Sequence, residues 1–330
     1  MTPWQARPFA QAVAALDAGR LPHALLLAGP AGLGKRDLAR RLARRLLCQA
    51  PRVSETCGEC RSCHLLAAGT HPDFFEETLG LNDKGELRKE ILIGQVRSLT
   101  GRLLLTPSLA AGQVALIHPA EAMNRSAFNA LLKTLEVPPP NRHLMLVADR
   151  PQRLPATIRS RCQWLRFELP PRAEARAWLL TNAHDARLAD EALDAAHGNP
   201  GLAAQFLTEG GLALRRTVAT DLAMLACGRQ SAVETALAWN EDHPGQRLRF
   251  AVELVNEHLA CRHGARRSDA LTAAGLRTGT STGSLAEWFD AGQRVLANHE
   301  TTLLQHLQLA ELLRHWQVMV HRASPRAGSN

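Results

Sequence analysis

The stretch from Gly29 to Arg36 has the residues of a phosphate-binding loop. Gly29, Gly34 and Lys35 match the spacing G-x-x-x-x-G-K-[ST]. In such a loop, backbone N–H groups and the lysine point at phosphate oxygens. The residue after the lysine normally supplies a hydroxyl to the Mg²⁺ that bridges a nucleotide's terminal phosphates, but here it is Arg36. A glycine-rich turn that merely connects a strand to a helix is the alternative, and the flanking apolar and helical stretches favour a phosphate-binding loop.

Nucleotide hydrolysis also needs acidic residues at the end of a second apolar strand. One acid holds Mg²⁺, and a second commonly orients the attacking water. After the apolar run 113–117, these positions hold His118 and Pro119. Glu121 lies beyond the strand end and after a proline, so it is a poor substitute. Together with Arg36, these departures predict a loop that could bind ATP or ADP but does not hydrolyse it.

Four cysteines lie close together after this loop. Cys48, Cys57, Cys60 and Cys63 have the spacing C-x8-C-x2-C-x2-C. Four thiolates suit a tetrahedral Zn²⁺ ion, and closed four-ligand sites are structural. Reactive or disulfide-bonded thiols in a flexible loop are the alternative, but clustered cysteines in a reducing cytosol more often bind metal. We therefore expect a structural zinc module over about residues 48–63.

Arg161 is a third candidate, in the stretch PATIRSRCQWLRF (155–167). A short helix is expected to end at Ser160, which places Arg161 just before the last strand of an α/β region. In a lone monomer, such an arginine is a solvated surface charge. In a ring of subunits with phosphate-binding loops, its planar guanidinium could instead neutralise charge on a neighbour's γ-phosphate.

The elements that must position these residues show in the hydrophobic pattern. Short apolar runs predict strands over residues 24–29, 73–78, 113–118, 143–148 and 163–169. Stretches with apolar residues three or four apart predict helices over residues 35–48, 93–105 and 125–136. Strands that alternate with crossover helices imply a parallel sheet covered on both faces.

After residue 170 the pattern is helical, with breaks at residues 197–201 and 277–284. The last long helix, 300–320, is expected to bury a stripe of Leu303, Leu307, Ala310 and Leu313. The predicted organisation is an α/β domain over residues 1–167, a small helical domain over 168–206, an all-α C-terminal domain over 207–322 and a disordered tail over 323–330.

Composition adds two expectations. The 330 residues include 39 Lys and Arg against 31 Asp and Glu, a net charge of +8. This balance favours polyanionic partners such as nucleic acid, although the basic residues are scattered and an arginine-rich composition explains them equally well. Neither a signal peptide nor an apolar run approaching the roughly 18 residues of a membrane span is visible, so we expect a cytoplasmic protein without a membrane partner.

Five stretches stand out as a set: LPHALLLAGPAGLGK (21–35), the four-cysteine module, HPD (71–73), SAFNALLKTLEVPP (126–139) and LPATIRSRC (154–162). Taken together, these motifs resemble the clamp-loader subunits of bacterial DNA polymerase III, which are AAA+ proteins. The resemblance covers about the first 205 residues, and the C-terminus is similar in layout only. It implies an AAA+ domain, a lid over 168–206 and a collar over 207–322.

Within that family, motor subunits hydrolyse ATP and one further subunit is a rigid, non-hydrolysing member. Besides the departures above, Ala148 and Asp149 replace the threonine pair of the motor subunits' sensor strand, and Gly201 replaces a lid arginine. The resemblance therefore implies the non-hydrolysing type, with Arg161 as an arginine finger for a neighbouring motor subunit.

The same resemblance implies partners. The chain would join motor subunits and a delta subunit in a hetero-pentamer that opens a sliding clamp and places it on primer-template DNA. Two other functions remain open from the sequence. One is an active ATPase, either a diverged motor subunit or a helper with an unusual metal site that uses His118. The other is a zinc-containing DNA-binding protein on an AAA+ scaffold.

Overall fold

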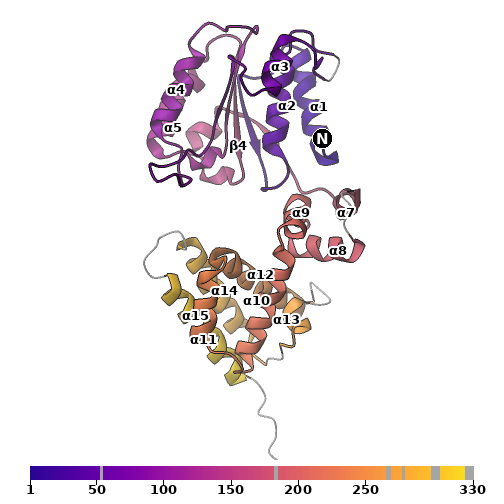
Figure 1. Ribbon diagram of the computed structural model, residues 1–330, viewed down its shortest axis with the longest axis vertical. Coiled ribbons are helices and arrows are strands. Elements are labelled where there is room, and N and C mark those ends of the chain that lie inside the picture. The colour runs from indigo at the N-terminus through magenta and orange to yellow at the C-terminus, as the bar shows by residue number, and fades with distance from the viewer. Residues whose placement is uncertain (53–54, 182–184, 265–268, 277–278, 299–304, 324–330) are drawn as a thin grey trace, which may run out of the picture. The chain divides into compact units, whose positions relative to one another are not determined.

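A computed structural model describes residues 1–52, 55–181, 185–264, 269–276, 279–298 and 305–323. The chain divides into two compact units, Met1–Gln205 and Phe206–Asn330 (Figure 1). Apart from Ala323, the predicted disordered tail lies outside the described residues.

The first unit is built on a five-stranded parallel sheet with the order β2-β3-β4-β1-β5. The strands are β1 (Ala24–Ala28), β2 (Phe74–Glu77), β3 (Gln113–Ile117), β4 (Arg142–Ala148) and β5 (Gln163–Arg166). Every residue of β1 and β3 is buried, as expected for strands covered on both faces. All five predicted strands are confirmed, and the predicted strand at 163–169 ends early, at Arg166.

Two helical layers cover the sheet. Figure 1 shows α1 (Pro3–Asp17), α2 (Lys35–Leu47) and α3 (Arg61–Ala67) on one side, and α4 (Ile93–Leu103) and α5 (Arg125–Glu136) on the other. Successive side chains of β1 point to opposite faces of the sheet. Leu26 packs with α4 and α5 on one face, whereas Leu25 and Leu27 pack with α1 and α2 on the other. The three helices predicted at 35–48, 93–105 and 125–136 are confirmed.

The HPD motif ties the cysteine segment to the sheet. Ser62, from α3, donates its hydroxyl to Leu47 O at 2.6 Å, and His71 Nε2 lies 2.6 Å from the same hydroxyl oxygen. Because the single hydroxyl hydrogen is already used, His71 Nε2 must carry a proton and donate it, while its Nδ1 accepts from Asp73 N at 3.0 Å. Burial lowers the pKa of His71, which favours this neutral form.

Asp73 fixes the loop before β3. Its buried carboxylate accepts backbone N–H groups of Ser108, Leu109 and Ala110 at 2.7 to 2.9 Å. Burial alone would raise the pKa of Asp73, but these three hydrogen bonds, together with one from the Gln113 side chain, outweigh it and the pKa is lowered.

Asp73→Asn is expected to lower the free energy of unfolding by about 1–3 kcal/mol at neutral pH, because the amide turns an NH₂ group toward backbone donors. Since the folded-state pKa lies below the unfolded value of about 3.9, the carboxylate stabilises the fold above that value and loses this effect as pH falls through the folded pKa. Urea unfolding of both proteins at pH 7, 5 and 3 measures this. A difference in stability that stays constant over this range would contradict the assignment.

After β5, three helices follow in the chain. They are α7 (Arg172–Thr181), α8 (Ala186–Ala195) and α9 (Pro200–Thr208), and α9 runs across the division at residue 205. Arg176 pairs with Asp190 at 2.9 Å and so joins α7 to α8. The predicted break at 197–201 falls at the turn between α8 and α9, where His197 and Gly198 have positive φ, but it ends earlier than predicted because α9 already begins at Pro200.

Among its described residues, the regular elements of the second unit are all helices: α10 (Gly211–Ala226), α11 (Ala232–Glu241), α12 (Pro244–Arg262), α13 (Ala270–Ala273), α14 (Thr282–Asn298) and α15 (Gln305–Ala323). Its core contains Trp239, Trp288 and Trp316, and the last two make an edge-to-face contact at 5.2 Å. None of the helices in the described part of the chain combines the length and apolar composition that crossing a bilayer requires.

The predicted stripe on the last helix is partly wrong. The buried residues of α15 are Leu309, Leu312, Leu313, Trp316 and Val320, whereas Leu307 is 54% exposed. Trp316 donates its Nε1 proton to Leu222 O of α10 and so sets which face turns inward. Leu307 lies two residues before Leu309, on the other side of the helix. Leu303 lies outside the described residues.

Candidate functional site

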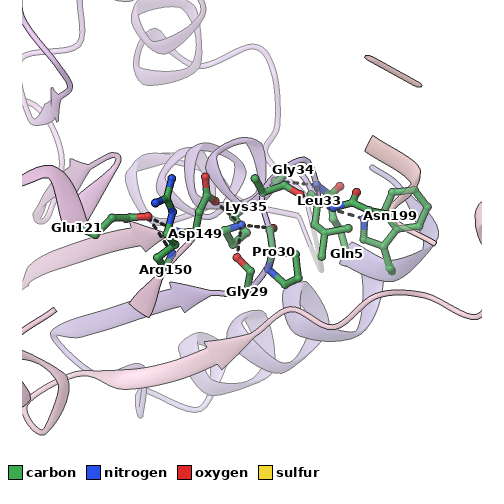
Figure 2. Close-up of polar contacts among 12 residues, drawn as sticks. Gln5, Gly29, Pro30, Leu33, Gly34, Lys35, Glu121, Asp149, Arg150 and Asn199 are labelled. Atoms are coloured by element: carbon green, nitrogen blue, oxygen red, sulfur yellow. Dashed lines mark hydrogen bonds and ion pairs between the residues drawn. The ribbon is translucent and has the colours of Figure 1, made fainter. Parts of the chain in front are cut away.

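Lys35 is the centre of the loop between β1 and α2. It is 3% exposed, and its Nζ donates to Gly29 O at 2.8 Å and to Pro30 O. The same Nζ forms an ion pair with Asp149 Oδ1 at 2.7 Å (Figure 2). An ammonium group has three N–H donors, so this chain's own atoms use all of them. A phosphate would have to displace one of these three acceptors to bind this lysine.

Glu121 positions Asp149 at the end of β4. One oxygen of Glu121, Oε1, accepts the backbone N–H groups of Asp149 and Arg150, both at 2.9 Å (Figure 2). Glu121 therefore stabilises the turn that follows β4. The sequence singled out Asp149 only as a departure from a sensor threonine, and its pairing with Lys35 had no local signal.

Arg36 also has a partner within the chain. Its Nε donates to Glu76 Oε1 at 2.7 Å, and Arg40 donates to the other oxygen of Glu76 at 2.9 Å. Glu76 is not among the site residues that the sequence predicts. Two adjacent acidic residues in the predicted strand 73–78 were a signal that could have indicated it. Burial lowers the pKa of His118, with a further contribution from the charge of Arg36, so His118 is held neutral.

Helix α1 covers one side of the loop. Gln5 Nε2 donates to Leu33 O at 3.2 Å and to Gly34 O at 2.8 Å, and Trp4 Nε1 donates to Leu33 O at 3.2 Å. Gly34 has a φ of +74°, and a Cβ there would lie 2.0 Å from Gln5 Nε2. Gly34 therefore serves both the turn and the contact with α1.

The segment at the start of α9 contacts the loop from another direction. Asn199 Nδ2 donates to Ala31 O at 2.8 Å, and its Oδ1 accepts the N–H groups of Gly201 and Leu202. A Cβ on Gly201 would lie only 1.8 Å from Gly32 O. The glycine that stands where the motor pattern has an arginine is thus required by close backbone packing.

The four cysteines come together as predicted. The sulfur of Cys48 lies 3.5 Å from Cys57 and 3.7 Å from Cys63, and the Cys57 to Cys63 distance is 3.8 Å. All four ligand atoms, including Cys60 Sγ, lie within 4.8 Å of one another. A tetrahedral zinc with Zn–S bonds of about 2.3 Å separates its sulfurs by about 3.8 Å. The cluster fits structural zinc, and these distances are far from a disulfide bond of about 2.05 Å.

Backbone groups prepare two of these sulfurs for metal. Burial opposes ionisation of Cys60, but backbone hydrogen bonds from Gln49 and Cys63 outweigh it and lower its pKa to about 6. A backbone hydrogen bond from Cys60 lowers the pKa of Cys57. Burial raises the pKa of Cys63 to about 12, so a bound cation would have to stabilise that thiolate.

Arg161 lies between α6 (Ala156–Arg159) and β5. Its Nη2 pairs with Glu136 Oε1 at 2.8 Å, and its Nη1 donates to Thr157 O at 2.9 Å. The side chain is 36% exposed. These partners belong to α5 and α6, so Arg161 takes no part in the hydrogen bonds that hold Lys35.

The fold and the loop define a P-loop α/β protein. The family model described as "DNA polymerase III, delta subunit" matches residues 4–171. The DNA polymerase III subunit delta' of Pseudomonas aeruginosa is 40% identical over 242 residues, which cover 72% of this chain and 71% of that protein. The delta' subunit of Escherichia coli is 36% identical over 278 residues, or 83% of this chain and 80% of that protein.

A shorter match reaches another subunit of the same polymerase. The subunit tau of Escherichia coli is 36% identical over 154 residues, which cover 47% of this chain and 22% of that protein. The matches to the delta' subunits cover most of both chains and therefore identify the family. This chain belongs to the DNA polymerase III delta' family.

Proposed function

We propose that this chain is a non-hydrolysing AAA+ subunit of the DNA polymerase III clamp loader that supplies Arg161 in trans to the ATP site of a neighbouring motor subunit. The observation that carries the first part is Lys35, whose three donors are engaged by Gly29 O, Pro30 O and Asp149. The proposal makes the chain a component of the polymerase holoenzyme without ATPase activity of its own.

The surroundings of the loop support the loss of hydrolysis. Arg36 takes the place of the metal-binding hydroxyl and is tied to Glu76. Glu121, the nearest acid after β3, accepts backbone N–H groups at the end of β4. ATP or ADP could bind at Gly29, Gly34 and Lys35 only if Lys35 exchanged one of its three present contacts.

The position of Arg161 supports a role in trans. It is a partly exposed guanidinium at the edge of the α/β domain, outside the loop's own contacts. In some nucleotide hydrolases, an arginine from a neighbouring protein stabilises the charge that develops on the γ-phosphate. Arg161 has the planar, permanently charged group that this role requires.

The partners follow from the family. Matches to both delta' and tau subunits favour a place beside motor subunits, with a delta subunit, in a hetero-pentamer. In the proposal, residues 168–206 form the lid, residues 207–322 form the collar that joins the subunits, and the assembly loads a sliding clamp on primed DNA. The zinc module would be structural, held by Cys48, Cys57, Cys60 and Cys63.

The purified chain is expected to show no ATP turnover above about 10⁻² s⁻¹ with Mg²⁺ and primed DNA, about a thousandfold below an ordinary enzyme rate of about 10 s⁻¹. A coupled ATPase assay measures this, and reconstitution with motor and delta subunits should restore clamp loading. Turnover that is abolished by Lys35→Ala would instead identify an active motor-type subunit.

A further inference from the structure

Glu136 is the acidic partner of Arg161. It is the last residue of α5, and its Oε1 lies 2.8 Å from Arg161 Nη2. Thr157 O accepts from Nη1 on the other arm of the guanidinium at 2.9 Å. The two contacts come from different helices, so they hold the planar group at two points.

This ion pair contributes little to the free energy of folding. The side chains of Arg161 and Glu136 are 36% and 50% exposed, and exposed pairs contribute little to folding. A carboxylate at the C-terminal end of a helix is also opposed by the helix dipole, which favours cations there. The placement of Glu136 therefore calls for a reason other than the stability of α5.

The contacts leave much of the arginine available. A guanidinium has five N–H donors, and Glu136 and Thr157 each accept from one arm. The remaining N–H groups make no hydrogen bond to the residues that the structure describes. Glu136 contacts the guanidinium through one oxygen only, so the guanidinium is oriented and can still receive an anion.

We propose that Glu136 is a positioning residue that orders Arg161 for a phosphate of the neighbouring subunit. This inference rests on the proposed function of Arg161. A free arginine side chain has many rotamers, and ordering it at the moment of reaction costs free energy. Glu136 and Thr157 order the side chain when the subunit folds, so this free energy is not lost at the moment of reaction. Supporting contacts preorganise binding sites in the same way.

Because Arg161 acts on charge that develops in the transition state, loss of its ordering lowers kcat and leaves KM for ATP unchanged. In the reconstituted loader with clamp and primed DNA, Glu136→Ala is expected to lower the single-turnover rate at the neighbouring motor site about three- to tenfold. Glu136→Gln keeps an acceptor oxygen at the same place and is expected to stay within about twofold of the unaltered loader.

A double-mutant cycle separates positioning from general stability. Adding Glu136→Ala to Arg161→Ala is expected to cause no further loss, because Glu136 acts through the arginine. The matched control is Asp17→Ala, which removes a carboxylate that is 46% exposed and pairs with Arg45 at 2.8 Å, on another helix. This control is expected to keep full activity.

The outcomes distinguish the two proposals. If Arg161→Ala lowers turnover and Glu136→Ala does not, Glu136 has no positioning role and the finger assignment stands. If Glu136→Ala lowers turnover equally in the Arg161→Ala background, or raises KM alone, its effect does not pass through Arg161 and the inference is wrong. If Arg161→Ala itself changes nothing, the proposed function fails.

Discussion

Arg161→Ala is expected to slow ATP hydrolysis at the neighbouring motor site of the reconstituted loader by about 10³-fold or more, which is the scale measured for arginine fingers. Total turnover falls by a smaller factor wherever other sites of the assembly continue to hydrolyse. The physical reason is that a methyl group cannot neutralise the charge spread over the γ-phosphate oxygens. Rapid-quench measurement of a single turnover with clamp and primed DNA resolves the affected site.

Two companion variants sharpen this result. Arg161→Lys keeps the charge but loses the planar fork, so it is expected to recover only part of the rate. Arg153→Ala removes another exposed arginine from the same part of the chain and is expected to keep the full rate. The free energy of unfolding of Arg161→Ala should stay within about 1 kcal/mol of the unaltered chain, because only an exposed ion pair is lost. An unchanged single-turnover rate in a complete complex would remove Arg161 from the site.

Loss of zinc is expected to have the largest effect on folding. Protein purified without chelator should contain about one zinc per chain, and Cys60→Ser should lower this content and unfold the segment around α3. Structural zinc sites contribute about 10–16 kcal/mol of binding free energy in small peptides, and the 48–63 segment has few buried side chains to replace it. Metal analysis and limited proteolysis measure both effects.

The control for the zinc experiment is Cys227→Ser, because Cys227 is an exposed thiol outside the cluster. Its zinc content and proteolysis pattern should match those of the unaltered chain. Less than about half an equivalent of zinc in the unaltered chain would argue against a four-thiolate site.

Local patterns in the sequence were enough to predict much of the first unit. The apolar runs that became β1 to β5 and the glycines and lysine of the loop lie within short windows, where spacing reflects geometry directly. The cysteine cluster was predictable for the same reason, since four ligands lie within sixteen consecutive positions, 48–63. Spacing alone did not predict which face of α15 is buried, and Leu307 is exposed. The reason is that the neighbouring helices determine which face is covered.

The amino-acid sequence by itself determined the elements, the phosphate-binding loop with its missing metal ligands, and the cysteine set. Only the tertiary structure decided what these residues contact. Asp149 forms an ion pair with Lys35, and Glu76 forms one with Arg36. Asn199 donates a hydrogen bond to Ala31 O, and the sequence separation of these pairs reaches 168 residues. The physical reason is that such pairs form where the order of the strands and the packing of the helices bring distant segments together, and no local pattern encodes that order.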